Sequence, residues 1–254
     1  GLNEHDAIDC GIPFPIKFIT NFYSIEKAKT YIRKCDKPFT IFIDSSVRQL
    51  TPTITLLEIL RKEGAIVENI LVIDEHSKSL EHFNKIIPDV VKKMPRADGT
   101  IIIIGGGVIL NFCAFVASTI HRGIIPYIIV PTTIMAISDV AIGSKSSLNI
   151  DFESDDITLK HILGTYANPS CIIMDKEFVK SLSNREIKIG LSESLKHGII
   201  QDKVLFHDSM ELIFSVSPDI DRCFEVSLRT QELKSNILLK DPFENHFGRT
   251  LLYG

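Results

Sequence analysis

The segment that decides the fold is TIIIIGGGVILNFCAFVAST, residues Thr100–Thr119. Its run of isoleucines lacks polar alternation, which predicts a strand covered on both faces, as in a parallel sheet. Three glycines follow, and a stretch of small and apolar residues then predicts a buried helix over 108–123. A strand that ends in glycines and opens a helix is typical of a phosphate-binding turn. The N–H groups at a helix N-terminus carry partial positive charge, and glycine lets a phosphate approach the backbone.

The glycine spacing differs from the usual dinucleotide fingerprint. A GxGxxG pattern that begins at Gly105 requires glycine at position 110, where Leu110 stands. The turn also follows the third predicted strand instead of the first. Taken alone, three glycines are as typical of a tight turn as of a phosphate site, and both interpretations stay open here.

Strand and helix patterns alternate over the first 175 residues. The sequence predicts strands at 38–46, 67–75, 99–107, 125–133 and 170–175, with helices at 50–65, 78–94 and 108–123. Pro88 is expected to interrupt the second of these helices. After residue 175 the pattern becomes helical throughout, over 184–215 and 218–241. We therefore expect an α/β fold: a Rossmann-like parallel-sheet domain over 1–175, followed by a mostly helical domain over 176–254.

Composition narrows the class of protein. The chain has 254 residues, 44% of them hydrophobic and 24% charged, which is enough for a large core and argues against long disorder. The net charge of −4, without a basic block, argues against nucleic acid as a partner. No apolar stretch reaches the roughly 18 residues that span a bilayer, so no membrane partner is expected. The five cysteines lack CxxC spacing, and no signal-peptide pattern is present, so we expect reduced thiols and a cytoplasmic protein.

Polar residues follow several of the predicted strands. Ligands of open α/β sheets bind beyond the carboxyl ends of the strands, and an acid there can accept hydrogen bonds from ribose hydroxyls. Each such residue alone is more often a cap or a turn residue, but their recurrence at four strand ends favours a binding site. Arg122 lies just before a predicted strand, and Asp139 and Lys145 lie in a stretch of small residues at 130–150 that we expect to be loop-like. Basic groups there suit a phosphorylated substrate. The residues at the strand ends are Asp44, Glu75, Lys78, Thr132 and Thr133.

The order of these motifs resembles that of the sugar phosphate cyclase superfamily, whose best-known member is 3-dehydroquinate synthase. The motifs are GGGVILNFCAFVASTIHRG, VPTTIMAISDVAIGSK, KHILGTYANP, GLSESLKHGII and KSNILLKDPFENHFGRTLLYG, in that order, and the resemblance covers about residues 38–254.

The resemblance implies an NAD-dependent metalloenzyme in which the glycine turn binds the NAD pyrophosphate. The NAD-binding residues that it implies are Asp44, Glu75, Lys78, Gly105, Gly106, Gly107, Val108, Thr132, Thr133, Asp139 and Lys160. The catalytic and substrate-binding residues that it implies are Arg122, Asp139, Lys145, Glu193, Lys196, Lys234 and Arg249.

Glu193 matches the family's first metal ligand, for Zn²⁺ or Co²⁺. Glu193 and Lys196 are three residues apart and share one face of a predicted helix, so a carboxylate and a cation meet there. His197 follows Glu193 by four residues, and we expect it to pack or to orient the site instead of binding metal. The resemblance places two histidine ligands beyond Gly254, so within these 254 residues we do not expect a complete tetrahedral site.

The implied reaction turns a small phosphorylated sugar into a carbocycle. Transient oxidation by NAD acidifies a C–H bond, phosphate leaves, the hydride returns, and ring opening with an intramolecular aldol closes the ring. A homodimer is usual in the family and is expected here.

Several positions depart from 3-dehydroquinate synthase. Leu110-Asn111 replaces Gly-Asp, His161 replaces Asn, and Leu252 replaces Asn. These departures, with LGTY at 163–166 and DPFE at 241–244, favour sedoheptulose 7-phosphate as substrate, as in 2-epi-5-epi-valiolone synthase. The alternatives that stay open are 3-dehydroquinate synthase, 2-deoxy-scyllo-inosose synthase, a non-catalytic homologue, and an NAD-dependent alcohol dehydrogenase of related architecture.

Overall fold

The structure, a computed structural model, describes residues 19–94, 96–152, 157–241, 243–244, 246, 248 and 251, with backbone alone at 152 and 157. Arg249 and Leu252 lie outside these residues, and so does Cys10.

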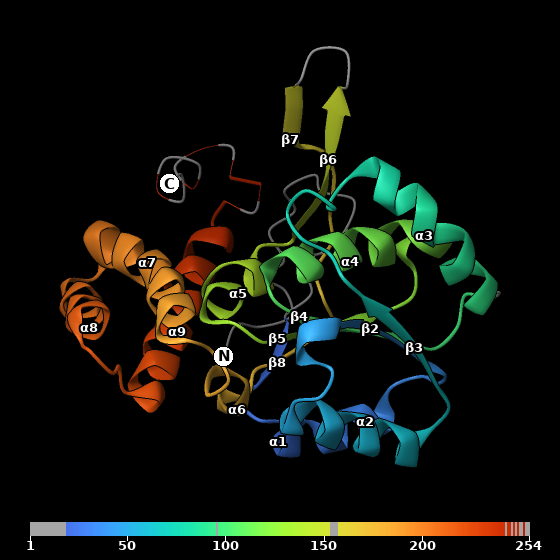
Figure 1. Cartoon of the computed structure of the whole chain (residues 1–254), viewed down its shortest axis with the longest axis horizontal. Coiled ribbons are helices and arrows are strands. Elements are labelled where there is room, and N and C mark those ends of the chain that lie inside the picture. The colour runs from blue at the N-terminus through green and yellow to red at the C-terminus, as the bar shows by residue number, and fades with distance from the viewer. Residues whose placement is uncertain are drawn as a thin grey trace.

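A six-stranded parallel sheet forms the centre of the molecule (Figure 1). Its spatial order is β1-β8-β5-β4-β2-β3, so the strand with the isoleucine run lies in the interior of the sheet. The predicted α/β class with a parallel sheet is confirmed. The strands are β1 (Thr20–Phe22), β2 (Phe39–Asp44), β3 (Ile66–Leu71), β4 (Thr100–Gly105), β5 (Tyr127–Pro131) and β8 (Cys171–Ile173).

Helices cover both faces of the sheet. Ile101 and Ile103 belong to one hydrophobic cluster with α3 (Leu80–Lys93) and α4 (Gly107–Thr119). Ile102 and Ile104 belong to the cluster on the other face, with α1 (Ile25–Lys34) and α2 (Thr51–Glu63). In Figure 1, α1 and α2 lie below the sheet and α3 and α4 above it. Alternate isoleucines therefore enter different cores, which explains why β4 lacks polar alternation.

The helices α6 (Lys176–Val179), α7 (Asn184–Gln201), α8 (Lys203–Phe214) and α9 (Ile220–Leu238) follow β8. The predicted helix over 184–215 is two helices, because Asp202 ends α7 and caps α8 by accepting hydrogen bonds from Val204 and Leu205 N–H, each at 3.0 Å. The same hydrophobic cluster that covers one face of the sheet continues into α7, α8 and α9. No described helix is both long enough and apolar enough to span a membrane.

Short 3₁₀ turns and a hairpin connect longer elements within the described residues. Three 3₁₀ turns, at Ser45–Val47, Ile120–Gly123 and Val140–Ile142, follow β2, α4 and α5 (Ile134–Ser138), respectively. An antiparallel hairpin of β6 (Lys145–Phe152) and β7 (Ile157–Tyr166) projects from the molecule at the top of Figure 1.

Two sequence-based expectations were wrong. Pro88 does not interrupt α3, since the helix continues through it to Lys93. Pro88 and Asn84 are both exposed, so water can satisfy the carbonyl of Asn84 that proline leaves without a donor. The stretch at 130–150, expected to be loop-like, instead contains α5, a 3₁₀ turn and the strand β6 that begins at Lys145.

We predict that Gly198→Ala destabilises the protein by about 2 kcal/mol, in the range of overpacked cores. A Cβ at Gly198 would lie 2.5 Å from the backbone of Phe206, where α7 packs against α8. Chemical denaturation measures the change. Ser192→Ala, on the exposed face of the same helix, is the control and should change stability by less than about 0.5 kcal/mol. Equal stability of Gly198→Ala and wild type would contradict the close helix contact.

Candidate functional site

The carboxyl ends of four neighbouring strands form one edge of the sheet. A Cβ at Gly105, the last residue of β4, would lie 3.1 Å from the Cβ of Asp44, the last residue of β2. A Cβ at Gly106 would lie 3.4 Å from Thr133, which follows β5. The predicted strand-end residues Asp44, Gly105, Gly106 and Thr133 are therefore contiguous. This edge is where ligands of open α/β sheets bind.

The three glycines play different parts at this edge. Gly105 is needed for packing, since a Cβ there would lie 2.8 Å from a side-chain carbon of Ile109 on α4. Gly106 is the N-cap of α4, and no described side chain caps that helix. A Cβ at Gly107 would meet only Val140, at 3.1 Å. The first N–H groups of α4, including that of Val108, thus open on a glycine-lined space that suits a phosphate.

Leu110, which stands where the fingerprint would have glycine, is buried in the core and donates its N–H to the carbonyl of Gly106. The helix therefore begins in the same way without that third glycine.

Some of the polar side chains along this edge already make hydrogen bonds within the protein. Asp44 accepts two hydrogen bonds from Ser46, at 2.9 Å from N–H and 2.8 Å from the hydroxyl. Thr133 caps α5 by accepting from the N–H of Ala136. The hydroxyl of Thr132 is buried without a hydrogen-bond partner among the described residues. A buried hydroxyl without a partner is rare, so it marks a point where a ligand can supply the missing bond.

Glu75 and Lys78 follow β3 at the end of this edge. Lys78 Nζ lies 3.5 Å and Lys160 Nζ 3.7 Å from Oε1 of Glu75, and Lys78 is almost fully buried. Asn149 of β6 ties the hairpin to this loop. Its backbone N–H donates to the carbonyl of Lys78 at 2.7 Å and its side chain donates to the carbonyl of Glu75 at 3.1 Å.

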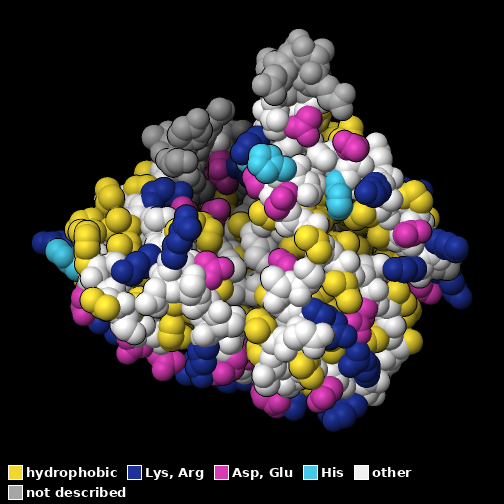
Figure 2. All heavy atoms as spheres, in the orientation of Figure 1, with side chains coloured by type: hydrophobic (Ala, Val, Ile, Leu, Met, Phe, Trp, Pro, Cys, Tyr) yellow, Lys and Arg dark blue, Asp and Glu magenta, His cyan; other side chains and the backbone are white. Residues whose placement is uncertain are grey.

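A cavity of about 500 Å³ lies between the hairpin, α5 and α9, and it brings together three of the predicted catalytic residues: Asp139, Lys145 and Lys234. Lys234 is buried and pairs with Asp139, bonding both its carboxylate and, at 3.0 Å, its carbonyl. Lys145 Nζ lies 2.5 Å from the carboxylate of Glu244. Figure 2 shows basic, acidic and histidine side chains gathered at the base of the hairpin, above the hollow between the two parts of the molecule.

Two residues that depart from the family pattern meet in this cavity. Asn111 accepts hydrogen bonds from the N–H of Ser147 at 2.9 Å and from its hydroxyl at 3.3 Å. Ser147 also lies 2.9 Å from Nδ1 of His161. The sequence alone gives no signal for Ser147, because a hairpin brings it between positions that are far apart in the chain.

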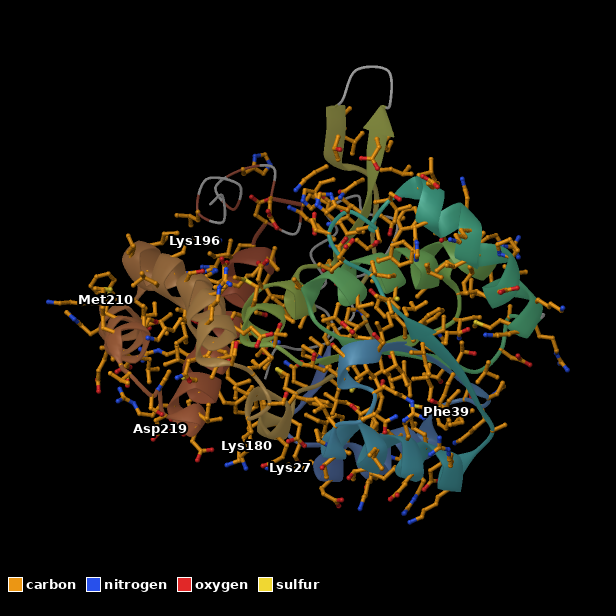
Figure 3. All side chains as sticks on the ribbon, in the orientation of Figure 1. Lys27, Phe39, Lys180, Lys196, Met210 and Asp219 are labelled. Carbon is orange, nitrogen blue, oxygen red and sulfur yellow. The ribbon has the colours of Figure 1, made fainter. Side chains whose placement is uncertain are left out.

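Glu193, Lys196 and His197 form a cluster on α7 that is not part of the cavity lining. Lys196 Nζ lies 2.6 Å and His197 Nε2 3.3 Å from Oε1 of Glu193. Burial raises the pKa of the Glu193 carboxyl, but His197 and Lys196 outweigh it and bring the pKa down to about 2. Lys196 lies on the upper part of α7 in Figure 3.

The fit of this cluster to a metal ion is partial. Lys196 Nζ and His197 Nε2 already face Oε1 of Glu193, so a cation bound by this oxygen would replace one of those contacts. No group of three or more His, Cys, Asp or Glu side chains suited to a metal ion occurs in the described part of the chain. These residues alone therefore do not form a metal centre.

Arg122 lies apart from the cavity. It follows the C-terminal end of α4, opposite the end that carries the glycines, and is exposed with a φ of 62°. Arg249, the remaining predicted catalytic residue, lies outside the described residues.

Comparison with known proteins identifies the family. Residues 69–189 match the family described as 3-dehydroquinate synthase N-terminal. The 3-dehydroquinate synthase of Streptococcus agalactiae is 34% identical over 217 residues, which are 85% of this chain and 59% of that protein. The chain thus spans about three fifths of the length of this curated relative.

Two solved structures share the fold. One, described as 2-deoxy-scyllo-inosose synthase complexed with carbaglucose-6-phosphate, NAD⁺ and Co²⁺, has a TM-score of 0.78 and 21% identity, covering 92% of this chain and 64% of that one. The other, 2-epi-5-epi-valiolone synthase from Streptomyces hygroscopicus subsp. jinggangensis with NAD⁺ and Zn²⁺ bound, has a TM-score of 0.74 and 22% identity, covering 90% and 63%.

Proposed function

The chain belongs to the sugar phosphate cyclase superfamily, and on that premise we propose that it acts as an NAD- and metal-dependent cyclase that eliminates phosphate from a small sugar phosphate. The observation that carries the proposal is the cavity that joins Asp139, Lys145 and Lys234, next to the glycine-lined N-terminus of α4. A homodimer, a cytoplasmic location and a boundary near residue 175 between an NAD-binding and a helical domain belong to the same proposal.

The edge of the sheet supports NAD binding. The N–H groups at the start of α4 suit the pyrophosphate, and Gly106 leaves room for it. Asp44 and Glu75 supply carboxylates for ribose hydroxyls. The buried hydroxyl of Thr132 has no hydrogen-bond partner among the described residues and can bond to the cofactor. The other residues proposed to contact NAD are Gly105, Gly107, Val108, Lys78, Thr133, Asp139 and Lys160. NAD⁺ supplies the hydride acceptor, which is restored at the end of the cycle.

The cavity supports binding of the sugar phosphate. Lys145 is half-exposed at its mouth, and its ammonium group pairs with the carboxylate of Glu244, which a phosphate can replace. Lys234 is held in place by Asp139 and contributes a fixed positive charge to the wall. Positive groups at fixed positions stabilise the negative charge that develops as phosphate leaves.

Glu193 is proposed as one ligand of a divalent metal ion, with Lys196 as an adjacent cationic group. His197 then orients the Glu193 carboxylate, because its ring nitrogen faces the same oxygen. Arg122 and Arg249 remain predicted substrate-binding residues.

Two seven-carbon substrates are the best candidates. The departures from the family pattern at Asn111 and His161 favour sedoheptulose 7-phosphate. The 34% identity to 3-dehydroquinate synthase favours the heptulosonate phosphate that is the substrate of that enzyme. At C1 the first carries a hydroxymethyl and the second a carboxylate, and the second also lacks the hydroxyl at C3. Glucose 6-phosphate, the substrate of 2-deoxy-scyllo-inosose synthase, is the third candidate.

The decisive assay offers these three sugar phosphates separately to the full-length protein with NAD⁺ and Zn²⁺. Phosphate release without accumulation of NADH is expected from one of them, because a cyclase returns the hydride that it takes. Net formation of NADH would instead identify a dehydrogenase. Absence of phosphate release from all three, with NAD still bound, would identify a non-catalytic homologue.

Lys145→Gln should lower turnover at least about 100-fold, the order seen when one preorganised charge or donor is removed from a transition-state site. NAD affinity should stay within about twofold, since Lys145 lies on the hairpin and not at the glycine turn. Lys180→Gln, at an exposed lysine of the helical part, is the control. Normal turnover by Lys145→Gln would remove Lys145 from the phosphate site.

Gly106→Ala should weaken NAD binding about tenfold or more while leaving the melting temperature almost unchanged. The added methyl group occupies the phosphate space and meets only Thr133, at 3.4 Å. Gly105→Ala is the contrast, because its methyl group would clash with Ile109 and should lower stability. Titration calorimetry with NAD⁺ and thermal denaturation separate the two effects, and unchanged NAD affinity in Gly106→Ala would place the nucleotide elsewhere.

Glu193→Gln should reduce the zinc content of the purified full-length protein, since the amide is a far weaker ligand than the carboxylate. Atomic absorption of dialysed protein measures this without an activity assay. Glu232→Gln, at an exposed glutamate of α9, should keep wild-type zinc. Equal zinc in both variants would exclude Glu193 as a ligand.

A further inference from the structure

His161 sits in an irregularity of the hairpin. The strands pair at Leu148 with Leu163 and at Ile150 with Leu159, so the single residue Asn149 on β6 faces three residues, 160–162, on β7. His161, the central residue of this bulge, has a φ of 62°. A non-glycine residue in the left-handed region costs of order 1 kcal/mol or more, and bulges beside active sites re-aim a side chain. The bulge turns His161 into the lining of the cavity that holds Lys145.

A chain of hydrogen bonds fixes the imidazole from behind. The amide of Asn111 has one orientation, because its nitrogen donates to the carbonyl of Lys145 at 3.3 Å while its oxygen accepts the N–H of Ser147 at 2.9 Å. The same oxygen lies 3.3 Å from the Ser147 hydroxyl, which donates to it. Since a hydroxyl has one hydrogen, Ser147 accepts from Nδ1–H of His161 at 2.9 Å.

With the hydrogen bonds in this direction, Nε2 of His161 carries no hydrogen and can accept a hydrogen bond. The structure shows no hydrogen bond from Nε2 to any residue it describes. An aspartate at position 111 cannot donate to the Lys145 carbonyl, so the two departures from the family pattern, Asn111 and His161, work as one unit through Ser147.

The surroundings keep the imidazole neutral near pH 7. His161 is exposed on one side, but its partial burial lowers the pKa of the imidazole, and the positive charges of Lys78, Lys160 and Lys145 lower it further, against the opposing effect of Glu75. These groups come from β6, from β7 and from the loop before α3, the elements that surround the bulge.

We propose that His161 is a specificity-determining residue whose Nε2 accepts a hydrogen bond from a sugar hydroxyl, so that the cavity selects a ketose phosphate with a hydroxymethyl group over one with a carboxylate. The inference rests on the proposed function and names its substrate class. Lys145 and Lys234 bind the phosphate, whereas His161 is the neutral hydrogen-bond acceptor in the cavity lining. A carboxylate can only accept hydrogen bonds, so it cannot donate one to Nε2. Its oxygen lone pair would instead face the lone pair of Nε2, which is repulsive.

The test compares kcat/KM for sedoheptulose 7-phosphate and for the heptulosonate phosphate, using the full-length protein with NAD⁺ and Zn²⁺. Wild type should prefer the first. His161→Asn supplies an amide that can donate to a carboxylate, and it should shift the ratio toward the heptulosonate about tenfold or more, the worth of one hydrogen bond to a charged group. Ser147→Ala, which removes the positioning hydroxyl, should shift the ratio in the same direction by less. Leu159→Ala, at an exposed residue of β7 that does not line the cavity, should leave it unchanged.

A second readout is the pH dependence of the same ratio. Protonation of Nε2 creates a cation that attracts a carboxylate, so the relative kcat/KM for the heptulosonate should rise as pH falls through the His161 pKa. That pKa lies below the ordinary value of 6.5. His161→Asn should abolish this pH dependence, which a merely structural role would not do.

The outcomes separate the two levels of the proposal. Release of phosphate from neither ketose by wild type would overturn the proposed cyclase function for these substrates, and this inference with it. Turnover with a ratio that stays within about twofold in both His161→Asn and Ser147→Ala, or a wild-type preference for the heptulosonate, would overturn the role of His161 while leaving the cyclase intact.

Discussion

The close approach of α4 to the end of β4 is the constraint on which the rest of the site depends. Gly105 allows Ile109 and Asp44 to pack where any side chain would collide with them. That approach brings the first turn of α4 to the sheet edge and leaves its N–H groups open beside Gly106. The carboxyl ends of the neighbouring strands reach the same edge because parallel strands end together. The space that is proposed to hold a phosphate is thus a consequence of strand-to-helix packing.

The sequence predicts the central architecture well because burial dictates its pattern. A strand covered on both faces has few positions that tolerate a polar residue, so β4 and β5 are recognisable from their isoleucines and valines. The edge residues Asp44 and Thr133 were also predictable, since each lies at the end of an apolar run. Gly105 was predicted as a cofactor residue, and the structure adds a packing role that spacing does not reveal.

The hairpin was not predictable in the same way. Many side chains of β7 are exposed, and the bulge breaks the alternation on which strand prediction relies. The partnership of Asn111, Ser147 and His161 depends on a tertiary contact between α4 and the hairpin, which no local pattern encodes. The expectation that Pro88 would interrupt α3 was wrong because Pro88 lies on the exposed face of the helix, where water can satisfy the free carbonyl.

The anchoring of the hairpin has a thermodynamic consequence. Asn149 holds the loop of Glu75 and Lys78 with two hydrogen bonds, and directly across the strands His161 faces the cavity. A molecule that orders the hairpin from the cavity side also orders the loop, and a molecule that orders the loop also orders the hairpin. Any free energy of coupling between the two binding events must be equal in both directions. For the nucleotide and sugar sites proposed above, the hairpin therefore predicts that each ligand changes the affinity of the other by the same factor.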